Sequence, residues 1–329
     1  MRGPDRPPSR WRVHGISSTG YRHIRDNTPC QDAWDRLETP GGLVLAVADG
    51  AGSAPRSGEG AREAVRLAVE AFAPVAAPWR RIGGARLCRE RMTEAFHEVR
   101  ARYLRWCEGP PGPYATTLTV VVAADGWLGQ ASVGDGLVLV RAAPVDAPGG
   151  GDTGAGSAGS GMTGASMTGS GMAGPGFAGT GTAGTGTAGT GGATERGSTE
   201  RGVREGAASP SYHLLPRAHT GSEYANETVF LGSPTALGQL RVDCVRDDGI
   251  DGVLLSTDGL TQALLRRAPA GPPLPHDAFL GHLFDRLGRS DYDHDEEDRR
   301  LSDFLASDQI TRVTGDDKTL LWAIRHDDH

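Results

Sequence analysis

The chain has 329 residues and a formal net charge of −7. This length allows one large domain or two small ones. Without a basic stripe, nucleic acid is not an expected partner. No apolar run approaches the roughly 20 residues that span a bilayer, and the N-terminus lacks the apolar region of a secretion signal, so no membrane partner is expected. The cysteines (Cys30, Cys88, Cys107 and Cys244) have no metal-type or redox-type spacing, which favours a reduced, cytoplasmic protein.

The N-terminal half predicts strands and two long helices. Residues 1–12 are expected to be a flexible tail, and an apolar run predicts a strand at 43–48. Apolar residues then recur at helical spacing over 58–73 and 85–106, each opposite an Arg/Glu-rich face. This pattern is typical of helices that cover a sheet. Further strands are predicted at 117–124, 127–133 and 137–141.

From residue 148 to residue 210 the composition is reduced mainly to Gly, Ala, Thr, Ser and Met. Such a tract cannot bury enough apolar surface to offset the entropy of ordering its backbone. A long insertion in a surface connection adds little closure entropy. We therefore expect a flexible insertion at 148–210 within one domain, which is formed by residues 13–147 and 211–326 and has roughly 250 residues for its core.

The C-terminal half predicts two more amphipathic helices, at 277–288 and 296–306. Its strands are expected at 228–231, 253–257 and 319–324. Strands clustered in runs, with helices grouped separately, favour an α+β layered sandwich over a doubly wound parallel sheet.

An acidic run, Asp291–Asp298, resembles a calcium loop at first sight. An EF-hand would need Gly at its sixth position and Glu at its twelfth, where this chain has Glu296 and Ser302. Acids also favour the start of a helix because of its macrodipole. We interpret the run as the solvated start of the helix at 296–306.

Aspartates follow apolar, strand-like runs at Asp49, Asp135 and Asp258, and Asp316 and Asp317 precede another such run. Carboxylates at the ends of neighbouring strands converge and repel one another unless protons or cations neutralise them. Hard oxygen donors without thiolate or imidazole suit Mg²⁺ or Mn²⁺. The set therefore suggests a metal-dependent phosphate enzyme.

Asp-Gly is also a common tight-turn dipeptide, so each occurrence has a second interpretation. Asp125-Gly126 lies between two predicted strands and reads as a hairpin turn. Asp248-Gly249 and Asp251-Gly252 also look like turn residues. Only the ordered set of aspartates favours metal ligands.

Read in order, the chain resembles the bacterial branch of the metal-dependent protein phosphatases of type 2C. The resemblance runs from about His14 to Ile324, without the Gly-rich tract. The matching segments are Pro29–Ala33, Val47–Gly52, Ala115–Leu118, Gly134–Gly136, Glu223–Thr228, Ser256–Leu260 and Asp316–Leu320. The resemblance implies a four-layer α-β-β-α sandwich of two antiparallel sheets flanked by helices.

It also implies the roles of the acidic residues. Asp49 would bridge two Mn²⁺ or Mg²⁺ ions with the Gly50 carbonyl as a further ligand, and Asp258 and Asp316 would complete the shell of the second ion. Asp32 would orient metal-bound water.

Three further residues are implied near the metals. Asp135 would contribute to a third, looser metal, although a tight turn explains it about as well. Asp317 would lie beside Asp316, and Gln31 stands where the family more often has glutamate.

Phosphate binding departs from the family pattern, because the usual arginine position is Asn27. Arg25 or Arg22 could supply a guanidinium from a shifted loop, and His23 could donate instead. For His23, a surface or supporting role is an equal alternative.

The implied activity is that of a serine/threonine protein phosphatase. Two divalent ions would lower the pKa of a bridging water, whose hydroxide attacks phosphorus without a covalent enzyme intermediate. A cysteine nucleophile would be redundant, so Cys30 is interpreted as buried or incidental. The expected partners are proteins phosphorylated on Ser or Thr and a cognate Ser/Thr kinase. The alternative is a catalytically weak pseudophosphatase that binds phosphoproteins.

Overall fold

The computed structural model describes residues 11–76, 84–124, 126–144, 209–216, 228–246, 249–268 and 271–326. Residues 148–208 of the predicted insertion lie outside this description, as do residues 1–10 and the motif residues 223–227. By their contacts, Met1–Val145 and Ala208–His329 form one compact unit and Asp146–Ala207 form another. The fold below is that of the first unit.

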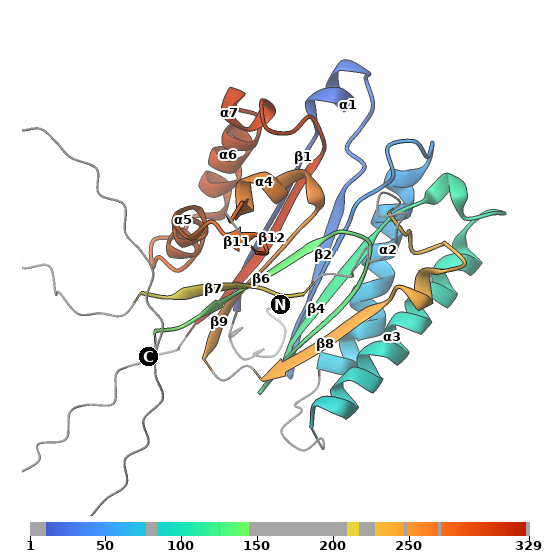
Figure 1. The fold of residues 1–329 in the computed structure, drawn as a ribbon, viewed down its shortest axis with the longest axis horizontal. Helices are drawn as coiled ribbons and strands as arrows, with labels where there is room; N and C mark the ends of the chain where they lie inside the picture. The colour runs from blue at the N-terminus through green and yellow to red at the C-terminus, as the bar shows by residue number, and fades with distance from the viewer. Residues whose placement is uncertain are drawn as a thin grey trace, which may run out of the picture. The chain divides into compact units, whose positions relative to one another are not determined.

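Two five-stranded antiparallel sheets form the centre of this unit (Figure 1). The first has the order β1-β12-β9-β6-β7 and consists of β1 Trp11–Ser18, β12 Lys318–Arg325, β9 Ile250–Ser256, β6 Leu137–Ala142 and β7 Ser211–Leu214. The second has the order β2-β3-β4-β5-β8 and consists of β2 Ala33–Thr39, β3 Gly42–Ala48, β4 Leu118–Ala124, β5 Trp127–Val133 and β8 Arg241–Arg246. A small hairpin pairs β10 Leu265–Arg266 with β11 Leu274–Pro275.

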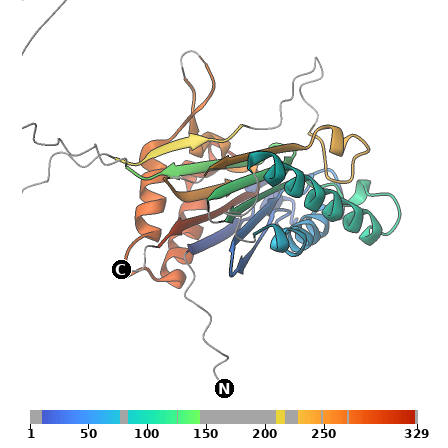
Figure 2. The same ribbon diagram turned by 90° about the horizontal axis from the view of Figure 1, so that it is seen from below.

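Helices cover the outer face of each sheet, so the unit has four layers (Figure 2). The second sheet is covered by α2 Ser57–Phe72 and α3 Ala85–Trp106, and the first by α5 Asp277–Leu287 and α6 His294–Leu305. The shorter helices are α1 Tyr21–Arg25, α4 Thr261–Leu264 and α7 Asp308–Thr311. The predicted α-β-β-α sandwich is confirmed.

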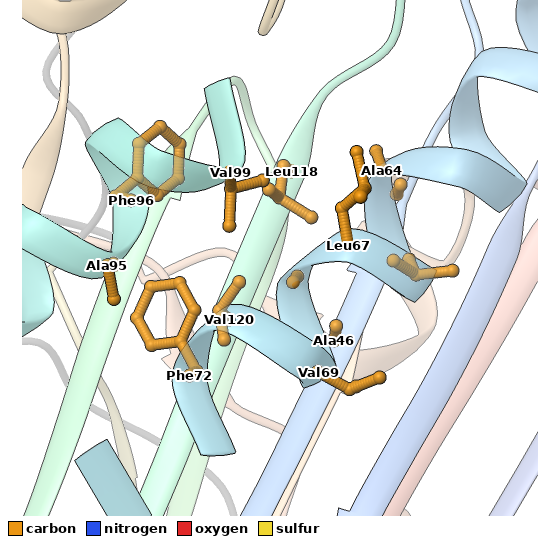
Figure 3. Close-up of a cluster of buried hydrophobic side chains, with 14 of the residues drawn as sticks. Ala46, Ala64, Leu67, Val69, Phe72, Ala95, Phe96, Val99, Leu118 and Val120 are labelled. Carbon is orange, nitrogen blue, oxygen red and sulfur yellow. The ribbon is translucent and has the colours of Figure 1, made fainter. Parts of the chain in front are cut away.

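The alternation of side chains along each strand explains the layering. In β3, Val44 and Ala46 pack against α2, whereas Leu43 and Leu45 point into the core between the sheets. Figure 3 shows the outer core, where Phe72 of α2 and Phe96 of α3 lie over the sheet. Buried strands with two apolar faces give the continuous apolar runs seen in the sequence.

Most predicted elements are confirmed, with differences at the ends. The helix predicted at 85–106 is α3 itself, and α6 begins at His294, two residues before its predicted start. The strand predicted at 228–231 is wrong: these residues form a connection in which the Leu231 N–H donates to the Thr116 carbonyl. Residues 11 and 12, predicted as part of the tail, belong instead to β1, which begins at the buried Trp11.

Two of the cysteines are joined, which corrects the expectation of a fully reduced chain. Cys88 of α3 and Cys244 of β8 form a disulfide, whereas Cys30 and Cys107 are free thiols. The spacing in sequence is 156 residues, so no local pattern could indicate this pair. In the described part of the chain, no helix is long and apolar enough to cross a bilayer.

The strands that flank the Gly-rich tract are partners. β6 and β7 pair antiparallel, with Ala142 opposite Ser211. The tract therefore connects two adjacent strands of one sheet. The domain limits proposed from the sequence stay a prediction.

Candidate active site

Five aspartates lie where loops meet strand ends. Asp32 immediately precedes β2 and Asp49 immediately follows β3. Asp135 follows β5, Asp258 lies two residues beyond the end of β9, and Asp316 lies two residues before β12. The sequence places them up to 284 positions apart, and the sheet order brings their strand ends together.

The strand registers explain this convergence. The start of β2 pairs with the end of β3 through Ala33 and Ala48. In the first sheet, the end of β9 pairs with the start of β12 through Ser256 and Leu320. Antiparallel neighbours therefore alternate in direction while their acidic termini share one end of the sandwich.

These carboxylates lie near enough to one another to interact electrostatically. Burial is the main cause that raises the pKa of Asp49, to about 11. Neighbouring negative charges add to this effect, and they come from Asp32, Asp258, Asp135 and Asp316. The five side chains thus form one electrostatic cluster, although Asp258 and Asp316 are exposed.

Asp32 is the buried member of this cluster. Burial raises its pKa to about 7, against the opposing hydrogen bond that the Thr257 hydroxyl donates to Oδ2 at 2.7 Å. The backbone N–H of Thr319 in turn donates to the Thr257 oxygen at 3.1 Å. Oδ1 of Asp32 is buried and makes no hydrogen bond to the described residues.

Two threonines fix the backbone of Asp49. The Asp49 N–H donates to the hydroxyl of Thr117 at 3.0 Å, and the Thr117 N–H donates to the Asp49 carbonyl at 2.8 Å. The hydroxyl of Thr116 also donates to that carbonyl, at 2.9 Å. The segment Ala115–Leu118, one of the segments that resemble the family, thus holds Asp49 in place.

The glycines distinguish site residues from turn formers. Gly126 and Gly249 have positive φ, at 91° and 87°, and a side chain there would meet open space, as in tight turns. At Gly259 φ is not in that region, but a Cβ would lie 1.9 Å from the Asp317 carbonyl oxygen. Gly259 is therefore required by close packing beside Asp258. The turn predicted at Asp251-Gly252 is wrong, because both residues lie in β9.

Asp316 and Asp317 have opposite surroundings. Asp316 is exposed, whereas Asp317 is buried, with 3% of its surface accessible. Asp317 accepts hydrogen bonds from the backbone N–H groups of Gly20 and Gln31, both at 2.6 Å. His23 Nδ1 lies 2.9 Å from Asp317 Oδ1. Asp317 thus joins the loop around α1 to the start of β12.

Lys318, the only lysine of the chain, lies next to these aspartates, a position at the site that the sequence does not indicate. It is buried, its ammonium donates to the Asp316 carbonyl at 3.1 Å, and burial lowers its pKa while the charges of Asp317 and Asp316 oppose this. The single positive charge of Lys318 offsets only part of the negative charge of the aspartate cluster. Cys30 lies nearby, and burial raises the pKa of its thiol to about 12, so it is a poor nucleophile.

The three basic candidates differ in availability. Arg25 is exposed and forms an ion pair with Asp26 at 2.8 Å. His23 is held beside Asp317. Arg22 packs its stem over Gly315, beside Asp316, and within the described residues no carboxylate pairs with its guanidinium.

The backbone at the family's arginine position is unusual. Asn27 has φ at 52°, in the left-handed region that Asn tolerates better than Arg. It lies within the turn that the Thr28 N–H closes by donating to the His23 carbonyl at 2.8 Å. The local turn thus favours asparagine over the family's arginine.

The donor set fits hard divalent cations. Carboxylates outnumber basic groups in the cluster, and two buried oxygens, Asp32 Oδ1 and Gln31 Oε1, make no hydrogen bond to described residues. The oxygens of Asp49, Asp258 and Asp316 do not all lie within 4.8 Å of one another. Repulsion between unneutralised carboxylates opposes a closer approach. Asp135 is less available as a cation ligand, because its Oδ2 accepts a hydrogen bond from the Thr228 hydroxyl at 3.2 Å.

Comparison with known proteins agrees with this architecture. The family model described as "Protein phosphatase 2C" matches residues 19–148 and 207–306. No curated protein sequence matches significantly.

Solved structures resemble the fold at low identity. A bacterial serine phosphatase is 12% identical with a TM-score of 0.51, covering 96% of this chain and 98% of the other. Serine/threonine phosphatase Stp1 from Staphylococcus aureus is 12% identical with a TM-score of 0.51, covering 99% and 100%. Serine-threonine phosphatase 2C from Toxoplasma gondii is 12% identical with a TM-score of 0.53, covering 95% and 94%. Since the family model also matches more than half of its residues, this chain belongs to the protein phosphatase 2C family.

Proposed function

We propose that the protein is a metal-dependent serine/threonine protein phosphatase. Its family and its fold support a phosphatase of this class. The observation that carries the proposal is the convergence of five aspartates at strand ends of both sheets, with the buried Asp32 bonded to Thr257 across the two sheets and Asp49 surrounded by the other four carboxylates. A cluster of this charge is stable in its ionised form only with cations.

Within this proposal Asp49 and the Gly50 carbonyl would hold two divalent cations, Mn²⁺ or Mg²⁺, and Asp258 and Asp316 would be direct ligands that complete the coordination of the second cation. Asp135 is the candidate ligand of a third cation. When bound, such cations supply an activated water and neutralise phosphate charge. Gln31 places its unpartnered amide oxygen at the same end.

Asp32 has the role of an orienting acceptor. Its Oδ2 is occupied by the Thr257 hydroxyl, which leaves Oδ1 to accept a hydrogen bond from a water in the site. Because Thr257 is itself fixed by the Thr319 N–H, the carboxylate has a defined direction.

Arg22 is the best candidate for the phosphate contact. It lies beside Asp316 and lacks a carboxylate partner in the described part of the chain, whereas Arg25 is paired with Asp26. A free guanidinium can bind phosphate oxygens in a bidentate manner. Replacing Arg22 by Ala is expected to lower kcat/KM for p-nitrophenyl phosphate about 10-fold or more. Arg25→Ala is the matched control and should have a much smaller effect.

Hydrolysis of p-nitrophenyl phosphate with Mn²⁺ tests the activity itself. The wild-type protein should be active, and Asp49→Asn should lower kcat by more than about a hundredfold. Asp308→Asn, an exposed aspartate on α7, is the control and should retain activity. Both variants should keep their circular dichroism spectrum. Activity that survives Asp49→Asn, or is absent from the wild type, would contradict the proposal.

Calorimetry distinguishes the pseudophosphatase alternative. An enzyme should bind Mn²⁺ through Asp49, and the heat should disappear in Asp49→Asn. A phosphoprotein-binding module would bind a phosphoserine peptide without Mn²⁺ and would not hydrolyse it. The substrate class proposed here is proteins phosphorylated on Ser or Thr, and a cognate kinase stays a prediction.

A further inference from the structure

A second cluster of metal-binding side chains lies on the outer face of the first sheet. It consists of His14 of β1 and of His294 and Asp298 of α6, and one ligand atom from each lies within 4.8 Å of the others. These residues belong to none of the matching segments of the phosphatase site. In sequence, Asp298 belongs to the acidic run that is expected only as the solvated start of a helix.

His14 is prepared as a ligand by its surroundings. It is completely buried, and its Nδ1 is hydrogen-bonded to the Tyr292 hydroxyl. The guanidinium of Arg12 covers the Tyr292 ring at 5.3 Å. Metal-binding histidines use the second ring nitrogen in this way, because the bond fixes the tautomer and the ring direction.

The other nitrogen of His14 has no satisfactory partner. Nε2 is buried and makes no hydrogen bond to the described residues, although Asp298 Oδ1 lies 3.1 Å away. A buried imidazole nitrogen 3.1 Å from a carboxylate oxygen can share a cation with that carboxylate.

The helix supplies two donors one turn apart. His294 and Asp298 are at positions i and i+4 of α6, and His294 Nδ1 lies 3.4 Å from Asp298 Oδ2. Asp293 caps the helix by accepting the Glu296 N–H at 2.8 Å, which fixes the first turn. Both side chains are about half exposed, at 49% and 45%, so an ion can enter from solvent.

We propose that His14, His294 and Asp298 bind a transition-metal dication, with Zn²⁺ as the best match, at a site separate from the phosphatase centre. Two imidazoles and one carboxylate suit Zn²⁺, Ni²⁺ or Cu²⁺, whereas Mg²⁺ and Ca²⁺ prefer oxygen ligands. The fourth position of a tetrahedral ion faces solvent.

Binding requires one local change. The rings of His14 and His294 are stacked, with centroids 4.3 Å apart and 28° between their planes. The half-exposed His294 must therefore rotate so that its nitrogen and that of His14 point to one ion. The bound ion would join β1 to α6 and stabilise that face of the sandwich.

Zn²⁺ titration by calorimetry, in excess Mg²⁺ to occupy the all-oxygen centre, tests this proposal. We expect one Zn²⁺ site in the wild type and in the Asp49→Asn background. His294→Ala and Asp298→Ala should each weaken it about 10- to 100-fold. His97→Ala, an exposed histidine on α3, is the matched control and should bind like the wild type.

A second readout reports the ligands directly. Co²⁺ bound to imidazole in a four-coordinate site should absorb strongly in the visible range, and this absorption should be lost in His294→Ala. Zn²⁺ should raise Tm in the wild type and in His97→Ala but not in His294→Ala. Zn²⁺ binding that is absent, unaffected by His294→Ala and Asp298→Ala, or abolished by Asp49→Asn would overturn the proposal. Because the side chains of His294 and Asp298 are about half exposed, their variants should fold even if His14→Ala does not.

Discussion

Two adjacent aspartates show how differently neighbouring residues act at the candidate site. Asp316 is exposed at the acidic end of the sandwich, whereas Asp317 is buried and accepts the N–H groups of Gly20 and Gln31. The sequence pattern alone assigns both to one acidic motif. Their environments place Asp316 at the exposed side of the acidic cluster and Asp317 in the hydrogen-bonded framework behind it.

Substitution should separate these two roles. Asp317→Ala leaves two buried donors unpaired, so the free energy of unfolding should fall by about 3 kcal/mol or more. Asp316→Asn should leave stability nearly unchanged but weaken Mn²⁺ binding and lower phosphatase activity. Urea unfolding and Mn²⁺ calorimetry on both variants measure this contrast. Equal loss of stability in the two variants would refute it.

The acidic cluster also predicts how stability depends on pH in a chelator. The folded state raises the pKa of Asp32 to about 7 and that of Asp49 to about 11, above the unfolded value of about 4. At a pH above the unfolded pKa and below the folded pKa of each group, the folded protein retains a proton that the unfolded chain has lost. Their stabilising contribution is therefore complete below about pH 4 and declines as pH rises.

We therefore expect Tm in EDTA to fall between about pH 5 and pH 8 and to fall less in Asp49→Asn. Saturating Mn²⁺ should suppress the decline, because cations stabilise the ionised carboxylates. Thermal unfolding at several pH values, with EDTA and with Mn²⁺, provides the measurement. A Tm in EDTA that rises over this range, or the same slope in Asp49→Asn, is the opposing outcome.

Residue-level prediction from the sequence depends on whether a pattern is local. The apolar runs that end at Asp49 and Asp258 indicate acidic strand ends, and the structure places both in one cluster. No local pattern reveals that Thr257 bonds Asp32, because the two residues are 225 positions apart. The cluster of His14 with His294 and Asp298 also depends on the contact between β1 and α6.

Among the secondary-structure elements, central strands were predictable and edge strands were not. The predicted strands that are confirmed correspond to β3, β4, β5, β6, β9 and β12, which lie inside the sheets. Edge strands β1, β2, β7 and β8 have shorter or more polar patterns; β2, for example, contains Asp35, Arg36 and Glu38. Charged side chains suit edges because they oppose pairing with other chains. They also remove the apolar run by which a strand is recognised.

The disulfide between α3 and β8 is expected to stabilise the packing of these two elements. It fixes edge strand β8 to the helix that covers the second sheet and links residues 156 positions apart. In the chain-entropy description such a link stabilises the fold by up to about 5 kcal/mol. Reduction should therefore lower Tm and the urea midpoint.

Unfolding with and without a reductant measures this effect. The Cys88→Ser/Cys244→Ser variant should resemble the reduced wild type and should not respond to reductant. If the oxidised wild type matches that variant in stability, the disulfide does not stabilise the fold.

For the whole molecule, the pairing of β6 with β7 predicts that the Gly-rich tract is dispensable for folding. Ala142 and Ser211 are opposite each other, so a short turn can connect the two strands. Replacing residues 145–208 by Asn-Gly should leave Tm within a few degrees and retain p-nitrophenyl phosphate hydrolysis. A variant that fails to fold would show that the tract is part of the domain.

The two proposed metal sites lie at different places on the sandwich. One end of the sandwich gathers carboxylates from both sheets, and the outer face of the first sheet carries the histidine cluster. The phosphatase centre has oxygen donors and the second site has imidazoles, so different metals are expected at each.

Anomalous diffraction from a Mn²⁺-soaked crystal tests the central claim most directly. The account predicts two adjacent Mn²⁺ peaks beside Asp49, with Asp258 and Asp316 turned toward one of them and Arg22 facing the open side. Manganese absent from that end of the sandwich, with these carboxylates pointing into solvent at full Mn²⁺ concentration, would contradict it.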